Sequence, residues 1–171
     1  QGAVGLPGYV DVFNFTIGRL GSGGMQMTVG IKFPSEHIFL WEGGNRAWES
    51  KEEYGGTMTT PRHPMSGSEE KKRVFLPSRI LIADIDRDGP NELIVAKNDR
   101  GGTPFMSNQR GFTSGVMQVF KYSNMSLTPY FRTRTLPGPA VDYALADYNN
   151  SGKLSLVVAV VTEQRSGMMQ D

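Results

Sequence analysis

The chain contains no cysteine, which excludes a disulfide framework and any cysteine-based zinc site. The chain also lacks a marked excess of positive or negative charge, because it has 18 lysines and arginines and 17 aspartates and glutamates. This balance gives no support for binding to nucleic acid or to an anionic membrane surface. No apolar run approaches the roughly 20 residues of a membrane-spanning helix. We therefore expect no nucleic-acid partner and no transmembrane segment.

Helical periodicity is scarce as well. Short apolar runs bounded by turn residues, such as 80–83 and 93–96, are typical of strands. The longer apolar run at 154–161 suits a strand that is covered on both faces. With 21 glycines and 10 prolines, the composition fits a turn-rich fold. The sequence predicts an all-β protein with little or no helix.

The most informative stretch covers residues 84–93 and reads D-I-D-R-D-G-P-N-E-L. Asp84, Asp86 and Asp88 stand at alternate positions, and Glu92 follows the loop glycine by three residues. Calcium takes about six to eight oxygen ligands, which short aspartate-rich loops supply. We predict a structural Ca²⁺ site formed by the side chains of these four residues, with the carbonyl of Pro90 as a backbone ligand.

The flanking residues indicate which kind of calcium loop this is. An EF-hand needs a glutamate at loop position 12 and a helix on each side, but position 12 counted from Asp84 is Val95. Because both flanks are strand-like, an EF-hand is excluded. The simpler alternative is an Asp-Gly turn whose side chains hydrogen-bond to their own backbone. Four carboxylates within nine residues disfavour it, because like charges repel unless a cation or a proton intervenes.

The loop recurs along the chain. Residues 147–156 read D-Y-N-N-S-G-K-L-S-L, and the loop glycines Gly89 and Gly152 lie 63 positions apart. A fainter copy at 17–30 places Gly23 66 positions before Gly89. Two spacings of similar size indicate a repeat, and a fixed period is typical of solenoids and propellers.

The copies differ in the ligands that they offer. The loop at 147–156 keeps Asp147 and Asn149, but it has Ser151 and Ser155 where carboxylates would stand. One negative charge holds calcium poorly, so we predict a weak or vestigial second site at the first three of these residues. The matching positions of the first copy, none of them a carboxylate, are Gly18, Leu20, Ser22 and Gln26.

The pattern Asp-x-Asp-x-Asp-Gly-x-x-Asp/Glu-Leu between two strands resembles the FG-GAP/VCBS repeat family of calcium-loop β-propeller repeats. Residues 84–93 match this pattern fully, 147–156 partly and 18–27 in outline. The stretch 76–161 is similar to the propeller part of bacterial envelope VCBS proteins. The resemblance implies that each repeat is one four-stranded blade, that the metal is structural, and that recognition lies on the faces of the propeller.

These observations predict a partial β-propeller of about two and a half repeats, organised as a single segment over residues 1–171. The expected parts are repeat 1 at about 10–53, a surface linker loop at 54–73, repeat 2 at about 74–136 and a partial repeat 3 at about 137–165. Propellers close with about four to eight blades. We therefore expect further segments or further copies to complete the propeller. A self-sufficient small sandwich is the least favoured alternative.

Individual strands follow from the same pattern. The second repeat predicts strands near 78–84, 92–97, 115–122 and 127–135, the last two joined by a turn at 123–126. The first repeat predicts a hairpin over 37–50 that turns at 43–45, where the sequence reads G-G-N.

The expected function is that of a non-enzymatic, calcium-stabilised propeller module that mediates protein or glycan interaction. Neither His37 nor His63 has a partner at catalytic spacing, so no catalytic residue is predicted. The alternatives are the accessory propeller of a secreted enzyme, or a structural subunit of a surface assembly completed by a neighbouring chain. Weak calcium sites fill more readily outside the cytosol. We therefore expect an extracytoplasmic bacterial setting, in the periplasm, at the outer-membrane surface or in the medium.

Overall fold

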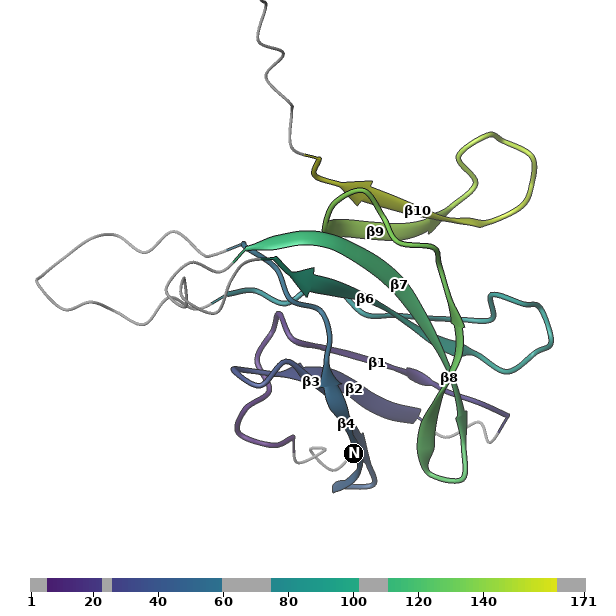
Figure 1. Ribbon diagram of the computed structural model, residues 1–171. Helices are drawn as coiled ribbons and strands as arrows, with labels where there is room; N and C mark the ends of the chain where they lie inside the picture. The colour runs from purple at the N-terminus through teal and green to yellow at the C-terminus, as the bar shows by residue number, and fades with distance from the viewer. Residues whose placement is uncertain (1–5, 23–25, 60–74, 102–110, 163–171) are drawn as a thin grey trace, which may run out of the picture.

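The computed structural model describes residues 6–22, 26–59, 75–101 and 111–162 (Figure 1). Ten strands and no helix occur in these ranges, so the prediction of an all-β fold is confirmed. Within the same residues, no helix is long and apolar enough to cross a membrane. Several predicted features lie outside the described residues: Gly23 of the first loop copy, most of the 54–73 linker, and the end of the third repeat.

The first sheet is a four-stranded antiparallel meander in which each strand pairs with the next along the chain. The predicted hairpin in this sheet is confirmed, and its turn uses Gly43 and Gly44 at positive φ, a conformation that glycine adopts without strain. The strands are β1 (Phe15–Arg19), β2 (Gln26–Lys32), β3 (His37–Glu42) and β4 (Asn45–Glu53).

The second sheet has the same order and the same antiparallel pairing. Its last two strands are joined by the predicted turn, in which Asn124 and Met125 both have positive φ. Two such residues form the tight turn that matches the twist of a hairpin. The strands are β5 (Leu81–Ala83), β6 (Glu92–Arg100), β7 (Phe112–Ser123) and β8 (Ser126–Arg132).

The third sheet contains two antiparallel strands, β9 (Ala140–Ala146) and β10 (Ser155–Val160). The three sheets lie one above the other in Figure 1, with the second sheet in the middle. The loop after β5 and the loop after β9 project from the same side of the molecule. The two loops with the calcium pattern are therefore on one side of the stack.

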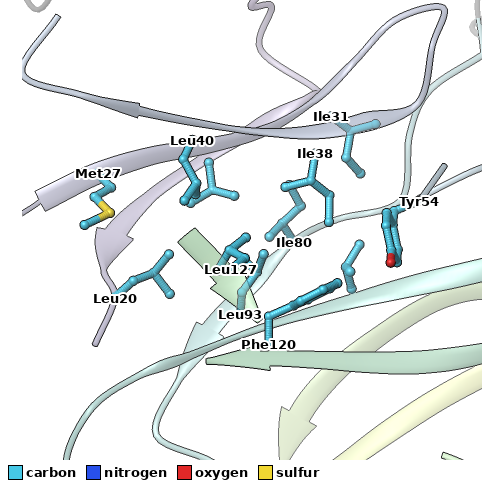
Figure 2. Packing of buried hydrophobic residues seen from close by; sticks show 12 residues of the cluster. Leu20, Met27, Ile31, Ile38, Leu40, Tyr54, Ile80, Leu93, Phe120 and Leu127 are labelled. Atoms are coloured by element: carbon cyan, nitrogen blue, oxygen red, sulfur yellow. The ribbon is translucent and has the colours of Figure 1, made fainter. Parts of the chain in front are cut away.

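One apolar core fills the space between the first and second sheets (Figure 2). Val29, Ile31 and Leu40 face it from the first sheet, and Leu93 and Phe120 face it from the second. All five side chains are at most 2% exposed. Burying an aliphatic or aromatic side chain of this size contributes about 1.5–3 kcal/mol, so this contact holds the two sheets together.

A second apolar core lies between the second and third sheets. Ile94 and Met117 of the middle sheet contact Tyr143 there, and Leu145 and Leu156 pack against the same cluster. Successive side chains of a strand point to opposite faces, so Leu93 enters the first core and Ile94 enters the second. The middle sheet is thus covered on both faces, which explains the continuous apolar run at residues 93–96 of β6.

Strand β5 is shorter than the predicted 78–84, because neighbouring residues take its hydrogen bonds. Ser78 N–H donates to the carbonyl of Gly55 at 2.8 Å, and Gly55 N–H donates to the carbonyl of Ala96 on β6, also at 2.8 Å. The Tyr143 hydroxyl accepts from Ala96 N–H at 3.1 Å and donates to the carbonyl of Arg79. The edge of β6 is therefore completed by β9 and by the segment after β4.

The same contacts correct the expected surface linker at 54–73. Tyr54 belongs to the first core and is 6% exposed, and residues 55–57 are buried as well. Asn98 of β6 donates to the carbonyl of Gly56 at 2.8 Å. The start of this segment is therefore not a solvated connection, because it supplies part of the contact between the two larger sheets.

Candidate metal centre

The predicted calcium loop leaves β5 at Asp84 and enters β6 at Glu92. Two of its residues have positive φ, Arg87 at 64° and Gly89 at 104°. Gly89 N–H donates to Asp84 Oδ2 at 2.9 Å, and Asp88 N–H donates to Asp86 Oδ1 at 3.2 Å. The loop thus folds back over its own first carboxylate, which brings the acidic side chains together.

The loop is also fixed to the first sheet. Asn91 Nδ2 donates to the carbonyl of Arg19 at 2.9 Å, and Gly21 N–H donates to the carbonyl of Asn91 at 3.1 Å. These bonds join the last residue of the loop to the end of β1 and the residues after it, so the end of the loop has a fixed position against the first sheet.

Three predicted ligands meet in this loop. Asp84, Asp86 and Asp88 each offer one carboxylate oxygen, and these oxygens all lie within 4.8 Å of one another. Asp84 is half-buried, whereas the other two are exposed. Three carboxylates so close repel one another unless a positive charge lies among them, so the cluster could hold a metal ion.

Glu92 adds a second and independent observation. Its side chain is 1% exposed, and its Oε2 accepts a hydrogen bond from Ile85 N–H at 3.0 Å. Its Oε1 is buried without a hydrogen-bond partner among the described residues, as is Asp84 Oδ1. Burial raises the pKa of Glu92 above its usual value, while the hydrogen bond from Ile85 opposes this change. A buried carboxylate oxygen without a donor is costly, and a bound cation would satisfy it.

The positive charge that the structure supplies is Lys121 of β7. Its Nζ lies 2.8 Å from Asp86 Oδ2, 2.6 Å from Asp88 Oδ2 and 3.9 Å from Glu92 Oε1. The hydrogen bond from Lys121 holds the pKa of Asp86 down at about 2. Hydrogen bonds to Asp86 and Asp88 raise the pKa of Lys121. The ammonium therefore stays charged at neutral pH and neutralises part of the cluster.

The ring of Tyr130 on β8 contacts the Lys121 ammonium group. The pairing of β7 with β8 shifts between Val119 and Phe120, which leaves Tyr130 as an extra residue between Pro129 and Phe131. Such a bulge redirects a side chain. The Lys121 Nζ lies 4.3 Å from the centroid of the Tyr130 ring, within the range of a cation–π interaction.

The donors fit a hard divalent cation such as calcium, which is bound by carboxylate and carbonyl oxygens. Asp86 and Asp88 form the exposed part of the cluster and Asp84 is half-buried, while Glu92 adds a buried oxygen that accepts no hydrogen bond from the described residues. Pro90 lies in the same loop and is half-buried. Its carbonyl and Glu92 stay predicted ligands.

The second predicted loop shares one contact with the first, from the N–H of the loop glycine to the first aspartate, but it offers a single carboxylate. Asp147 Oδ1 accepts from Ser151 N–H at 2.8 Å, and Asp147 Oδ2 accepts from Gly152 N–H at 2.7 Å. Its only carboxylate is therefore used by the turn itself. Asn149 and Ser151 are exposed, and the acidic cluster found among the described residues is the one at Asp84–Asp88. The weak or vestigial site at Asp147, Asn149 and Ser151 stays a prediction.

The corresponding positions of the first loop offer no carboxylate ligand for a metal. Leu20 is fully buried in the first core, and Gly18 and Gln26 lie on paired strands. Ser22 is exposed.

Sequence reasoning missed Lys121 and Tyr130, which lie more than 25 residues after the loop. A signal for Lys121 existed in the pairing of β6 with β7. Leu93 stands opposite Phe120, and one further antiparallel step sets Glu92 opposite Lys121. A register prediction would therefore have placed this lysine beside the buried glutamate. Tyr130 had no such signal, because a bulge cannot be read from strand periodicity.

Comparison with known proteins adds no relative: no family model, no curated protein and no solved structure matches this chain.

Proposed function

We propose that this chain is a non-enzymatic β-propeller segment of the FG-GAP/VCBS type, stabilised by calcium at the loop between β5 and β6. The proposal assigns it a role in protein or glycan recognition outside the cytoplasm. It rests on the carboxylate cluster of Asp84, Asp86 and Asp88, together with the buried oxygen of Glu92 that accepts no hydrogen bond from the described residues. A calcium ion there would neutralise the repelling carboxylates and fix the connection between β5 and β6.

The stacking of the sheets supports the propeller part of this proposal. Two four-stranded antiparallel meanders pack face to face, and a third sheet begins in the same way over the next face. In the proposed arrangement each sheet is one blade. The loops at 84–92 and 147–154 are the connections between the first two strands of consecutive blades, which explains why both project from one side (Figure 1).

The outer face of the third sheet favours a second candidate, a structural subunit that is completed by further strands. Ala144, Val157 and Ala159 are exposed on this face, Val157 at 42%. Within the described residues, β10 pairs with β9 and with no other strand. An open strand edge beside an apolar face favours pairing with another chain or segment. Sedimentation at increasing protein concentration separates this candidate, because assembly through the face would raise the sedimentation coefficient.

Thermal unfolding in EDTA and in about 1 mM calcium tests the proposed site. A ligand that binds only the folded form stabilises it by roughly 2.7 kcal/mol at a hundred times its Kd. For a chain of this length that corresponds to a rise of about 5–10 °C in Tm. Magnesium at the same concentration should not reproduce the rise, because it demands a smaller octahedral site.

Two matched variants locate the effect. Asp86→Ala removes a carboxylate from the cluster and is expected to abolish the calcium-dependent rise in Tm. Asn149→Ala changes the equivalent position of the second loop and is expected to keep the rise. Each variant is compared with itself in EDTA, so a general loss of stability does not affect the result. An unchanged response of Asp86→Ala, or equal losses in both variants, would reject the assignment of the site.

A further inference from the structure

Lys121 occupies the position where a metal ion would be expected. Its ammonium group lies 2.8 Å from Asp86 Oδ2 and 2.6 Å from Asp88 Oδ2. It extends from β7, a different strand from those that flank the loop. Among the described residues, Lys121 is the cation in every ion pair of Asp86, Asp88 and Glu92.

The ammonium and a calcium ion would compete for the same oxygens. Calcium takes its carboxylate ligands at about 2.3–2.6 Å, so an ion bound to Asp86 and Asp88 would lie against the present position of the Lys121 Nζ. Two positive charges at that separation repel strongly even with partial solvent screening. Occupancy by one cation therefore excludes the other.

Lys121 can leave the carboxylates without losing contact with solvent or with an aromatic ring. Tyr130 projects beside it from the bulge in β8, with the Nζ 4.3 Å from the ring centroid. The Lys121 side chain is 35% exposed, so its flexible stem can move outward into solvent or further across the exposed aromatic ring. A fully buried lysine that left its carboxylates would keep its own charge unpaired inside the protein, which is costly. Lys121 avoids this cost because its side chain reaches solvent.

We propose that Lys121 is a built-in counter-cation, which neutralises Asp86 and Asp88 when calcium is absent and which calcium must displace in order to bind. The inference rests on the calcium site proposed above and adds a residue that sets its affinity. In this arrangement the loop stays closed over its carboxylates without metal, because Lys121 ties it to the β7–β8 hairpin. The competition raises the calcium concentration at which the metal replaces the lysine.

Calorimetric titration of the purified protein with calcium chloride tests the competition. Lys121→Met removes the ammonium and keeps an unbranched apolar stem. We expect its Kd for calcium to be at least about tenfold lower than that of the unmodified protein, because the repelling charge is gone. The matched control is Lys97→Met, which removes the charge of another lysine of the second sheet, paired there with Glu52 of β4 in the first sheet. Its Kd should equal that of the unmodified protein.

A second measurement uses the unmodified protein and does not depend on the folding of a variant. An amine-reactive acetylating reagent is applied in EDTA and in saturating calcium, and the labelled lysines are identified by mass spectrometry. In EDTA the ammonium of Lys121 is held by two carboxylates and should react slowly. Calcium should increase its labelling rate several-fold and leave the rate at Lys97 unchanged.

The outcomes separate this inference from the proposed function. If the unmodified protein and Lys121→Met bind calcium equally, or the variant binds more weakly, the competition is refuted and the calcium site stands. If neither protein binds calcium, both proposals fail. If only Lys121→Met binds calcium, the competition is supported, and the calcium-stabilised state is rejected for the natural chain. An acetylation rate at Lys121 that calcium leaves unchanged would also refute the displacement.

Discussion

The hydroxyl of Tyr143 links the third sheet to the second through two hydrogen bonds, so its removal should lower the stability of the protein. The side chain is 2% exposed. Its hydroxyl accepts from Ala96 N–H at 3.1 Å and donates to the carbonyl of Arg79. Tyr143→Phe keeps the ring and deletes both of these hydrogen bonds.

The expected cost follows from where the two partners lie. Ala96 is fully buried, so its N–H would be left without the acceptor that the hydroxyl provides, at a cost of about 1–3 kcal/mol. The bond from the hydroxyl to the carbonyl of Arg79 is part-buried, so its loss adds to this cost. We expect the free energy of unfolding to fall by about 2–3 kcal/mol, which corresponds to about 5–10 °C in Tm for a chain of this length.

Urea unfolding followed by circular dichroism measures this change. The control is Tyr148→Phe, which deletes the same atom from a side chain that is 71% exposed in the second loop. This control should lie within about 0.5 kcal/mol of the unmodified protein, as surface substitutions usually do. A Tyr143→Phe variant as stable as Tyr148→Phe would refute the role assigned to the hydroxyl and, with it, the way that β9 completes the edge of β6.

Two further predictions concern the cores. Leu93→Ala should lower the free energy of unfolding by about 2–5 kcal/mol, because it leaves a cavity between the first two sheets. Leu154→Ala, at a residue that is 65% exposed, should change the free energy of unfolding little. Chemical unfolding of both variants checks this, and equal effects would contradict the described packing. Burial raises the pKa of Tyr143 from 10.0 to about 12, so the folded chain keeps this proton after the unfolded chain has lost it. The contribution of this proton to the free energy of unfolding should therefore be fully present below pH 10. It should be lost as the pH rises towards 12, which lowers the free energy of unfolding by about 3 kcal/mol. Tyr143→Phe should show a smaller fall in a pH series of urea unfolding curves, and an identical fall would mean that another group titrates.

Much of the local structure could be predicted because it depends on neighbouring residues. The strands on either side of the acidic loop followed from short apolar runs, and the hairpin turns followed from Gly43-Gly44 and from the residues between β7 and β8. The meeting of Asp84, Asp86 and Asp88 was also predictable, since alternate side chains in a turn that bends at a glycine converge. The short β5 and the buried start of the 54–73 segment were not, because their hydrogen-bond partners come from β6 and β9.

The sequence by itself determined the all-β fold and the chemistry of the acidic loop, because strand period, turn residues and carboxylate spacing are local properties of the chain. Only the tertiary structure decided how that loop is neutralised. Stacking buries Glu92 and leaves one of its oxygens without a donor, and the pairing of β6 with β7 brings Lys121 to the same carboxylates. These residues are close because of sheet register and a bulge at Tyr130, and neither depends on distance along the chain.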